Sequence, residues 1–479
     1  MLGISTTNAR VGGFRGGISA EAKTIYNRII ADGGVSNLSR LNFFVKGLKT
    51  IYGSLSNVPV CYDAHWIGYK LGSGTGATSG QAAAKLYSLT VAGDAVQSTA
   101  ASQPLLLSHN GVDNYFFSPK INGNSCTSPS SVAANISSDF EIIVKADMRD
   151  TSTDGMFIGK ADTVGQRSYY LYYTGGTGTI NFVISTNGTN FFTASSTNYS
   201  ITANTIFWLK VTRTGTTVTF YKSIDGITYT TINVTSLSGN IFAGTDQLTI
   251  GNGIAGGYPY GGKIYRATIS NSIGGAPVVD FNPATYNAST SQTAWTSSTG
   301  EIWTINTGTA TTGYKGQLVS KTIVMSDGVD DKMTSSVITA ISDRTNYIAV
   351  KTNENSGYVI DDINTLAANG VLLRTLPGIG IITNAATVTE ASAVNRTLKL
   401  STTKLSTLTQ GSAINNGTEV TGVVIGAQTT DGVMVFANGN GGSYSNINLN
   451  TLVISNSADN ATNRTAMYNL IRSLNNNAF

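Results

Sequence analysis

The stretch Phe207–Tyr229, with the sequence FWLKVTRTGTTVTFYKSIDGITY, decides the fold of this chain. Apolar and polar side chains alternate along its first residues with a period of two, which is the pattern of a half-buried strand. A turn at Thr214–Gly215 separates this strand from a second one, and a turn at Ser223–Gly226 separates the second strand from a third, which is expected to begin at Ile227. Three short strands joined by tight turns predict an antiparallel meander.

The same residues resemble the central strands of laminin-G-like, or concanavalin-A-like, jelly rolls. Trp208 stands at the opening of the first strand, and the second turn has the Ser-x-Asp-Gly pattern of that family before the aromatic Tyr229. The resemblance covers residues 135–272. It implies an antiparallel sandwich of two sheets.

The composition fits a folded, turn-rich β protein of two or three domains. Of the 479 residues only 12% are charged, where a soluble domain has about a quarter, and 53 are Gly. Lys and Arg are scattered, and the net charge of +4 is small, so nucleic acid is not an expected partner. The first twenty residues lack the apolar core of a signal peptide, and no apolar run approaches the roughly 18 residues that cross a bilayer, so no membrane contact is expected.

An internal repeat predicts two jelly rolls in tandem. The string KLYSLTVAG at 85 is followed by LLLSHNGVDNYF, and EIWTINTGT at 301 is followed by TIVMSDGVDDKM. Both copies also end in ISNS, at 269–272 and 454–457. We therefore expect a first sandwich over residues 58–277, a linker over 278–300 and a second sandwich over 301–458. The middle of the second copy lacks both the Trp and the Ser-x-Asp-Gly turn.

Helices are expected at both ends of this mainly β chain. After a Gly-rich arm over 1–18, apolar stripes at helical spacing predict a helical hairpin over 19–57, with Ser19 as the first cap. Residues 459–479 should form a terminal helix and an Asn-rich tail. That helix is too short to be stable alone, so it should dock on the second sandwich or on the hairpin.

The hairpin string IYNRIIADGGVSNLSRLNFFVKGLKTIY resembles the helical hairpin that precedes the jelly roll in bacteriophage structural proteins, and Asp280–Pro283 resembles a segment of related phage proteins. This resemblance implies a virion component, namely a head decoration protein, head fibre or tail-associated protein, assembled in the host cytoplasm and located in the virion. Its expected partners are other virion proteins and copies of itself. Arg10 and Arg15 of the arm are the candidate anchoring residues.

The sequence does not predict an enzyme or a cofactor. Histidine occurs only as His65 and His109, and Cys61 near His65 is not accompanied by an oxyanion or orienting motif. A glycosidase needs two paired carboxylates, and Glu141 and Asp147 have Ile and Lys at the intervening positions of the same face.

The acidic residues and the two cysteines do not form an evident site either. Two acidic sets, Asp147, Asp150 and Asp154 or Asp327, Asp330 and Asp331, could supply oxygen ligands to calcium, but neither has EF-hand spacing, so no metal is predicted. Cys61 and Cys126 are too few to form a disulfide framework and fit a reducing cytoplasm; whether they pair stays open.

Exposed aromatic side chains are the remaining candidates for a binding site. Tyr258 and Tyr260, and Tyr444 in the second copy, could stack against sugars, and a host surface polysaccharide is then a further partner. The alternative interpretation is that these rings cap a sheet edge or meet a neighbouring subunit. A carbohydrate-binding adhesin of a bacterial cell surface is the alternative function.

Overall fold

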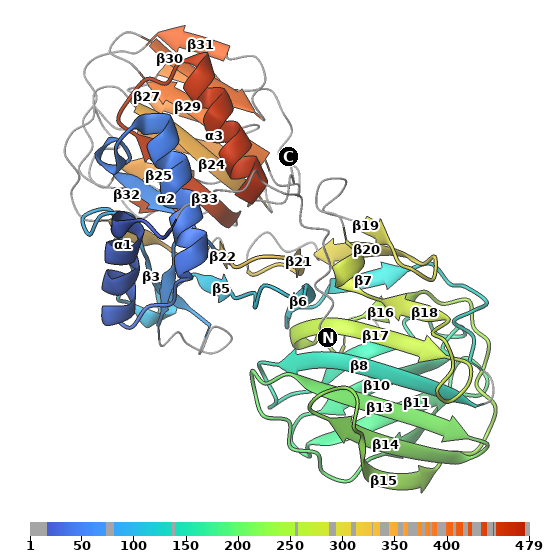
Figure 1. Ribbon diagram of the computed structural model, residues 1–479. Coiled ribbons are helices and arrows are strands. Elements are labelled where there is room, and N and C mark those ends of the chain that lie inside the picture. Colours follow the sequence, from blue (N-terminus) through green and yellow to red (C-terminus); the bar gives the residue numbers. More distant parts are fainter. Residues whose placement is uncertain are drawn as a thin grey trace. The chain divides into compact units, whose positions relative to one another are not determined.

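The computed structural model of the chain divides into two compact units, each of which is described by itself (Figure 1). Unit 1 contains residues 1–106 and 323–479, and unit 2 contains residues 107–322. The described residues are 17–72, 81–136, 139–253, 257–286, 294–307, 313–327, 329–335, 344–352, 358–362, 371–375, 379–383, 386–389, 399–405, 409–414, 420–423, 433–437, 444 and 447–474. The predicted fold class is confirmed, because each unit is a β-sandwich and helices lie near both ends of the chain.

Unit 2 consists of two antiparallel sheets. The strands of the first sheet, in order across it, are β15 (Thr230–Ser236), β14 (Thr217–Ser223), β13 (Phe207–Thr214), β8 (Phe140–Met148), β17 (Gly261–Ser270), β6 (Tyr115–Pro119) and β21 (Gln317–Val319), with β18 (Val279–Phe281) also paired to β17. The strands of the second sheet are β12 (Phe191–Ser195), β11 (Thr179–Ser185), β10 (Tyr169–Thr174), β9 (Gly155–Lys160), β16 (Leu248–Ile250), β7 (Asn124–Ser128), β20 (Ile302–Thr307) and β19 (Ala294–Thr296).

The predicted meander is confirmed as β13, β14 and β15. Leu209 and Val211 of β13 and Phe220 of β14 are fully buried in the core between the sheets, as their alternation predicted. The third strand begins at Thr230 instead of Ile227. The turn holds the intervening residues, because Oδ1 of Asp225 accepts hydrogen bonds from the backbone N–H groups of the two residues after Gly226.

Unit 1 is also a sandwich. Its first sheet is β31 (Val420–Val423), β30 (Thr409–Ile414), β29 (Lys399–Leu405), β24 (Arg344–Thr352), β33 (Ile447–Ser455), β22 (Ile323–Met325) and β5 (Leu105–Leu107), with β1 (Val60–Tyr62) also paired to β33. Its second sheet is β28 (Ala386–Thr389), β27 (Ile379–Thr383), β26 (Val371–Thr375), β25 (Tyr358–Asp362), β32 (Val433–Val435), β23 (Met333–Ser335), β4 (Ala95–Val96), β3 (Ala83–Leu86) and β2 (Tyr69–Leu71).

The first sheets of the two units have the same strand order but different chain connectivity. Counted across the sheet, the places of β15, β14, β13, β8, β17, β6 and β21 in unit 2 are taken in unit 1, in the same order, by β31, β30, β29, β24, β33, β22 and β5. In addition, β1 pairs with β33 as β18 pairs with β17. Unit 2 runs without interruption from β6 to β21. In unit 1 the strand that corresponds to β6 is β22, which follows unit 2 in the chain. The strands that correspond to the last strands of unit 2 are β1 to β5, which come from the start of the chain. Unit 1 is therefore a circularly permuted version of unit 2, and unit 2 is inserted between β5 and β22.

This arrangement corrects the predicted tandem boundaries. Residues 58–106 of the predicted first sandwich belong to unit 1, and residues 301–322 of the predicted second sandwich belong to unit 2. The predicted linker, residues 278–300, supplies β18 and β19 to unit 2. In that segment Phe281 packs against Trp295 with 5.6 Å between the ring centroids, as part of the core.

The error arose from one of the two repeated motifs. The NGVDN turn connects β5 to β6, whereas the SDGVDD turn connects β22 to β23, so the two turns are not equivalent in the fold. The ISNS motifs are equivalent, because Ile269 pairs with Val279 and Ile454 pairs with Val60 at matching places in their sheets. Treating these two turns as equivalent therefore shifted the predicted boundaries.

The predicted helices are confirmed. The hairpin consists of α1 (Ala20–Ala31) and α2 (Leu38–Tyr52), capped by the side chains of Ser19 and Asn37. α2 ends at Gly53, whose positive φ of 74° is one that glycine adopts readily.

The terminal helix α3 (Ala461–Leu474) docks on both of its predicted supports. Asp459, just before α3, accepts hydrogen bonds of 2.6 Å from the hydroxyls of Tyr52 on α2 and Tyr347 on β24. Tyr347, Cys61 and Val453 are fully buried although they are not part of the core between the sheets. The helices thus cover an apolar outer face of the first sheet of unit 1, where Figure 1 shows α2 and α3 over β24 and β33.

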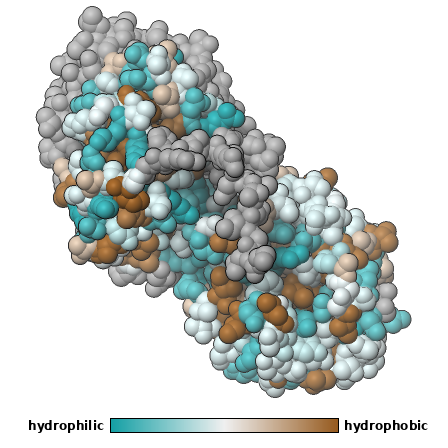
Figure 2. All heavy atoms as spheres, viewed as in Figure 1, coloured by the Kyte–Doolittle hydropathy of each residue, from teal (hydrophilic) through white to brown (hydrophobic). Residues whose placement is uncertain are grey.

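The exposed surface reflects the composition. On the face shown in Figure 2, much of unit 2 has the pale colour of residues with intermediate hydropathy, and apolar side chains are scattered among hydrophilic ones. Few charges and many hydroxyl side chains give this surface weak long-range electrostatics and many hydrogen-bonding groups.

Candidate functional site

The three tyrosines that the sequence indicated as candidate sugar contacts lie in three different environments. Tyr260 is fully buried, and its hydroxyl donates a 2.5 Å hydrogen bond to the backbone oxygen of Asp147, so the prediction that it faces a sugar is wrong. Tyr444 is half-buried in unit 1, where its backbone forms an isolated bridge with Ala437. Tyr258 is half-buried in unit 2 and joins a group of aromatic rings.

This group, the tyrosine patch, consists of Tyr170, Tyr172, Phe191 and Tyr258. The ring centroids of Tyr172 and Tyr258 are 5.2 Å apart, and Tyr170 lies 5.3 Å from Tyr172 and 5.2 Å from Phe191. Tyr170 is buried and forms the floor, whereas the other three rings are half-buried and reach solvent. Aromatic pairs at these separations attract one another beyond the burial of their area.

Strand geometry places these rings on the outer face of the second sheet of unit 2. On β10, Tyr169, Leu171 and Tyr173 point into the core, so Tyr170 and Tyr172 point away from it. Met156, Ala161 and Val183 pack beneath the rings and are buried. Tyr258 is positioned by its backbone oxygen, which accepts a 3.1 Å hydrogen bond from the N–H of Met156. Three of the four patch rings therefore lie on paired strands, and the fourth, Tyr258, lies in a loop that is hydrogen-bonded to β9.

Polar groups border the patch on two sides. The guanidinium carbon of Arg167 lies 5.0 Å from the ring centroid of Phe191. On the other side Asn181 is fixed by a hydrogen bond of 2.6 Å from the hydroxyl of Ser195 to its Oδ1 atom. Burial, together with the neighbouring Tyr172, raises the pKa of Tyr258, so its phenol stays neutral and can both donate and accept hydrogen bonds.

The sequence contains a signal for the patch on β10. The run SYYLYYT at 168–174 places tyrosines on both faces of one strand. One face must lie in the core, so the other face must present tyrosines outward. Phe191 carried no comparable signal, because its contact with Tyr170 depends on the pairing of β11 with β12.

The two carboxylates weighed as a catalytic pair are each engaged by lysine. Oε2 of Glu141 lies 3.9 Å from Nζ of Lys210, and Oδ2 of Asp147 lies 3.4 Å from Nζ of Lys263. Asp147 is almost completely buried, and this burial raises its pKa. Both residues thus have structural partners on the outer face of the first sheet of unit 2.

The predicted Cys and His candidates also lie in structural environments. Cys61 and Cys126 are free, buried thiols, and burial raises the pKa of each well above its usual value. A thiol of that kind is a poor nucleophile at neutral pH. Nδ1 of His65 lies 3.4 Å from a guanidinium nitrogen of Arg40. His109 accepts a 2.9 Å hydrogen bond from the N–H of Gly111 through its Nδ1 atom.

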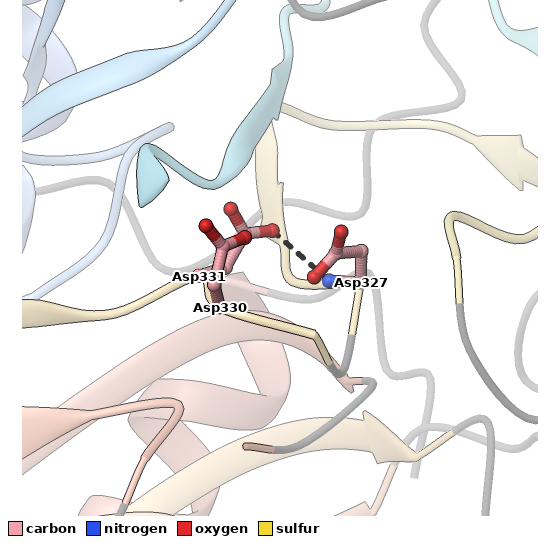
Figure 3. Close-up of side chains that lie close together, drawn as sticks. All are labelled: Asp327, Asp330 and Asp331. Carbon is pink, nitrogen blue, oxygen red and sulfur yellow. Dashed lines mark hydrogen bonds between the residues drawn. The ribbon is translucent and has the colours of Figure 1, made fainter. Parts of the chain in front are cut away.

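Of the acidic groups in the described residues, Asp327, Asp330 and Asp331 lie close enough to share a cation (Figure 3). One carboxylate oxygen from each lies within 4.8 Å of the others. Asp331 accepts a 3.0 Å hydrogen bond from the N–H of Asp327, and Asp327 accepts one of 2.8 Å from the N–H of Val329. These are contacts that acidic residues commonly make in turns. Burial raises the pKa of Asp327.

The other acidic set, Asp147, Asp150 and Asp154, does not form such a cluster in the described part of the chain. Asp147 is paired with Lys263, and Oδ2 of Asp150 lies 3.3 Å from Nζ of Lys120. Asp154 instead accepts a 2.9 Å hydrogen bond from the N–H of Gly175.

Two further expectations concern anchoring and membranes. The proposed anchoring residues Arg10 and Arg15 lie outside the described residues. Of the helices in the described part of the chain, none is both long and apolar enough to span a bilayer.

Comparisons with known proteins complete the description. No protein-family model matches the sequence, and the search of curated proteins gave no match. Similar solved structures include the LG1-3 region of the laminin alpha2 chain, with 11% identity and a TM-score of 0.29; the match covers 72% of this chain but only 62% of that fragment. Domains LG4-5 of the mouse laminin alpha1 chain match with 10% identity and a TM-score of 0.28, over 76% of this chain and 96% of theirs. A putative carbohydrate binding protein from Bacteroides ovatus matches with 14% identity and a TM-score of 0.30, over 44% of this chain and 60% of its own.

Proposed function

We propose that this chain is a non-enzymatic binding protein and that the tyrosine patch of unit 2 holds a carbohydrate. We further propose that it acts as a structural component of a bacteriophage virion, as a head decoration protein, head fibre or tail-associated protein. In this role it binds other virion proteins and copies of itself, and the patch contacts a polysaccharide of the host surface. The chain would be assembled in the host cytoplasm and located in the virion.

The geometry of the patch carries the first part of this proposal. Tyr172 and Phe191 on the sheet and Tyr258 in the adjoining loop offer half-buried ring surface. A pyranose ring has an apolar C–H face and a polar rim, so it can stack on the rings while its hydroxyls reach Arg167 or the phenol groups. Sites of this kind combine apolar surface with a few fixed polar groups.

The virion setting depends on other features. It is supported by the resemblance of the hairpin string to phage structural proteins. A bacterial surface adhesin could use the same patch. Cryo-electron microscopy of purified particles distinguishes the two, since the adhesin would be missing from them. If residues 1–17 anchor the chain, their deletion leaves both units folded but prevents incorporation into particles.

The carbohydrate proposal is tested with binding to a panel of soluble bacterial polysaccharides, measured by biolayer interferometry. We expect Tyr172→Ala and Tyr258→Ala each to weaken binding by about tenfold, a loss of about 1.4 kcal/mol. Tyr172→Phe, which keeps the ring, should bind nearly as well as the unmodified protein.

Tyr221→Ala is the matched control for this experiment. Tyr221 is also a half-buried outward ring of unit 2, but it lies on β14, under the ammonium group of Lys210 and away from the patch. Equal binding by the Tyr172→Ala protein and the control, or no binding to any polysaccharide of the panel, would refute the role of the patch.

A further inference from the structure

A groove at one end of unit 2 is separate from the tyrosine patch. It has a volume of about 520 Å³, within the range of small-molecule sites, about 300–1,000 Å³. One wall comes from residues 199–207, with the ring of Tyr199, and the other wall comes from residues 222–230, including the Ser-x-Asp-Gly turn. We call it the Tyr199 groove. Hydroxyl side chains are frequent along both walls, and the side chain of Ile224 stands at the rim with 92% of its surface exposed.

One cation, Lys222, lies on the wall of the groove and has no carboxylate partner among the described residues. Nζ of Lys222 is 5.4 Å from the ring centroid of Tyr199, and no carboxylate oxygen of the described residues lies within 4.0 Å of it. Burial raises the pKa of Tyr199, so the ring stays a neutral phenol. A lysine held over an aromatic face can donate hydrogen bonds to a ligand that stacks beside it.

One anion lies on the same walls and is fixed in place by the turn. Oδ1 of Asp225 accepts hydrogen bonds of 2.8 Å each from the hydroxyl of Ser223 and from the N–H groups of Ile227 and Thr228. These bonds hold the pKa of Asp225 at about 2, so it is charged at physiological pH. Its other oxygen, Oδ2, accepts no hydrogen bond within the described part of the chain and can accept one from a ligand.

The turn that carries Asp225 is rigid. Gly226 has a φ of 73°, and a Cβ atom placed on it would lie 2.5 Å from the Trp208 ring, so glycine is required there. The aspartate therefore presents Oδ2 to the groove from a fixed position, and a ligand would not need to order it.

We propose that the Tyr199 groove binds a neutral pyranose unit, as a second carbohydrate site of unit 2. One hydroxyl accepts a hydrogen bond from Lys222, a neighbouring hydroxyl donates one to Oδ2 of Asp225, and the apolar face of the sugar stacks on Tyr199. A hydroxyl both donates and accepts, so a neutral sugar satisfies both charges, whereas a ligand with a net charge would gain at one and lose at the other. This inference rests on the proposed carbohydrate-binding function and names a substrate class for a separate site.

The test uses the full chain with ¹³C-labelled isoleucine δ1 methyl groups, observed by NMR. Ile224 and Ile206 both line the groove and report on its occupancy. The probes are the methyl glycosides of glucose, galactose, mannose, rhamnose and N-acetylglucosamine, with methyl glucuronide as the acidic comparison. We expect at least one neutral glycoside to shift both signals in a saturable way. If none does, or if only the glucuronide does, the proposal is overturned.

Variants assign the hydrogen bonds. Lys222→Met keeps the aliphatic chain over Tyr199 but removes the positive charge. Asp225→Asn keeps an oxygen that can accept the hydrogen bonds of the turn but removes the negative charge. Each variant should raise the Kd for the neutral glycoside by about tenfold. Lys210→Met is the matched control, because Lys210 also lies over a tyrosine, at 4.8 Å from the Tyr221 ring, but does not line the groove. An unchanged Kd in both groove variants would overturn the proposed contacts.

The same titration separates this inference from the function of the patch. Tyr172→Ala should leave the methyl shifts at the Tyr199 groove unchanged. Polysaccharide binding that depends on Tyr172, together with an empty groove, would refute this inference and leave the proposed function standing. The reverse result would refute the role of the patch alone.

Discussion

The permuted sandwich predicts which pieces of the chain fold on their own. Unit 2 is continuous, so a fragment of residues 107–322 should fold alone. A fragment of residues 301–479 contains all of the predicted second sandwich, but it lacks β1 to β5 and the helical hairpin. We expect this second fragment to be unfolded, because the missing strands supply part of its core.

The size of the loss follows from the buried side chains. Val60, Tyr62, Leu86 and Leu106 lie in the core of unit 1 with at most 1% of their surface exposed, and all four precede residue 107. Burial of a large apolar side chain contributes about 1.5–3 kcal/mol, so these four contribute about 6–12 kcal/mol. The whole stability of a domain is about 5–15 kcal/mol, so the fragment loses stability comparable to the total.

The assay compares urea unfolding, followed by far-UV circular dichroism, with the dispersion of amide signals in NMR spectra. The fragment 107–322 should unfold cooperatively, whereas 301–479 should not. A permuted chain, in which residues 323–479 are joined by a flexible linker to residues 17–106, restores unit 1 and should regain a cooperative transition. A cooperative transition and dispersed spectrum for 301–479 alone would refute the permuted arrangement.

Two more predictions concern stability. Burial lowers the pKa of Lys160 to about 8. Between about pH 8 and pH 10 the native state therefore loses a proton that the unfolded chain keeps, so the unfolding free energy of unit 2 should rise with pH, by about 2–3 kcal/mol in total. Urea titrations should show this rise in the unmodified protein and not in Lys160→Met; equal pH slopes would contradict it. Asp459→Ala removes the charged acceptor of Tyr52 and Tyr347 and should destabilise unit 1 by about 3–6 kcal/mol, while Asp459→Asn costs less. Thermal unfolding should show the loss in the transition of unit 1 only, and a shift in that of unit 2 would argue against it.

Local patterns predicted the elements of the fold but not the way they pair. Period-two alternation located β13 and β14, and the cap Ser19 located the start of α1, because each depends on neighbouring residues. The pairing of Val60 with Ile454 joins positions almost at opposite ends of the chain. Alternation shows that a strand has a buried face, but it does not identify the partner strand. The permutation therefore required the structure.

The same limit explains the outcome for the candidate sugar contacts. Tyr258 and Tyr260 are two residues apart, so they would share a face if both were in one strand. β17 begins only at Gly261, and Tyr258 precedes it in a loop, so the parity rule does not apply. Tyr260 turns into the core and Tyr258 turns outward to meet Tyr172. Tyr258 joins the patch through its contact with Tyr172, which the spacing along the chain does not reveal.

The outer face of the first sheet is apolar in unit 1 and charged in unit 2. This difference supports assigning ligand contact to unit 2. In unit 1 that face is apolar, with Tyr347 and Val453 fully buried outside the core, and it needs the helices as a cover. In unit 2 the corresponding face carries ion pairs, such as Lys145 with Asp113 at 2.9 Å and Arg266 with Asp280 at 2.9 Å, and is stable in water without a cover. Unit 2 therefore does not depend on the terminal helices. Its tyrosine patch and Tyr199 groove can bind a ligand without first displacing another described part of unit 2.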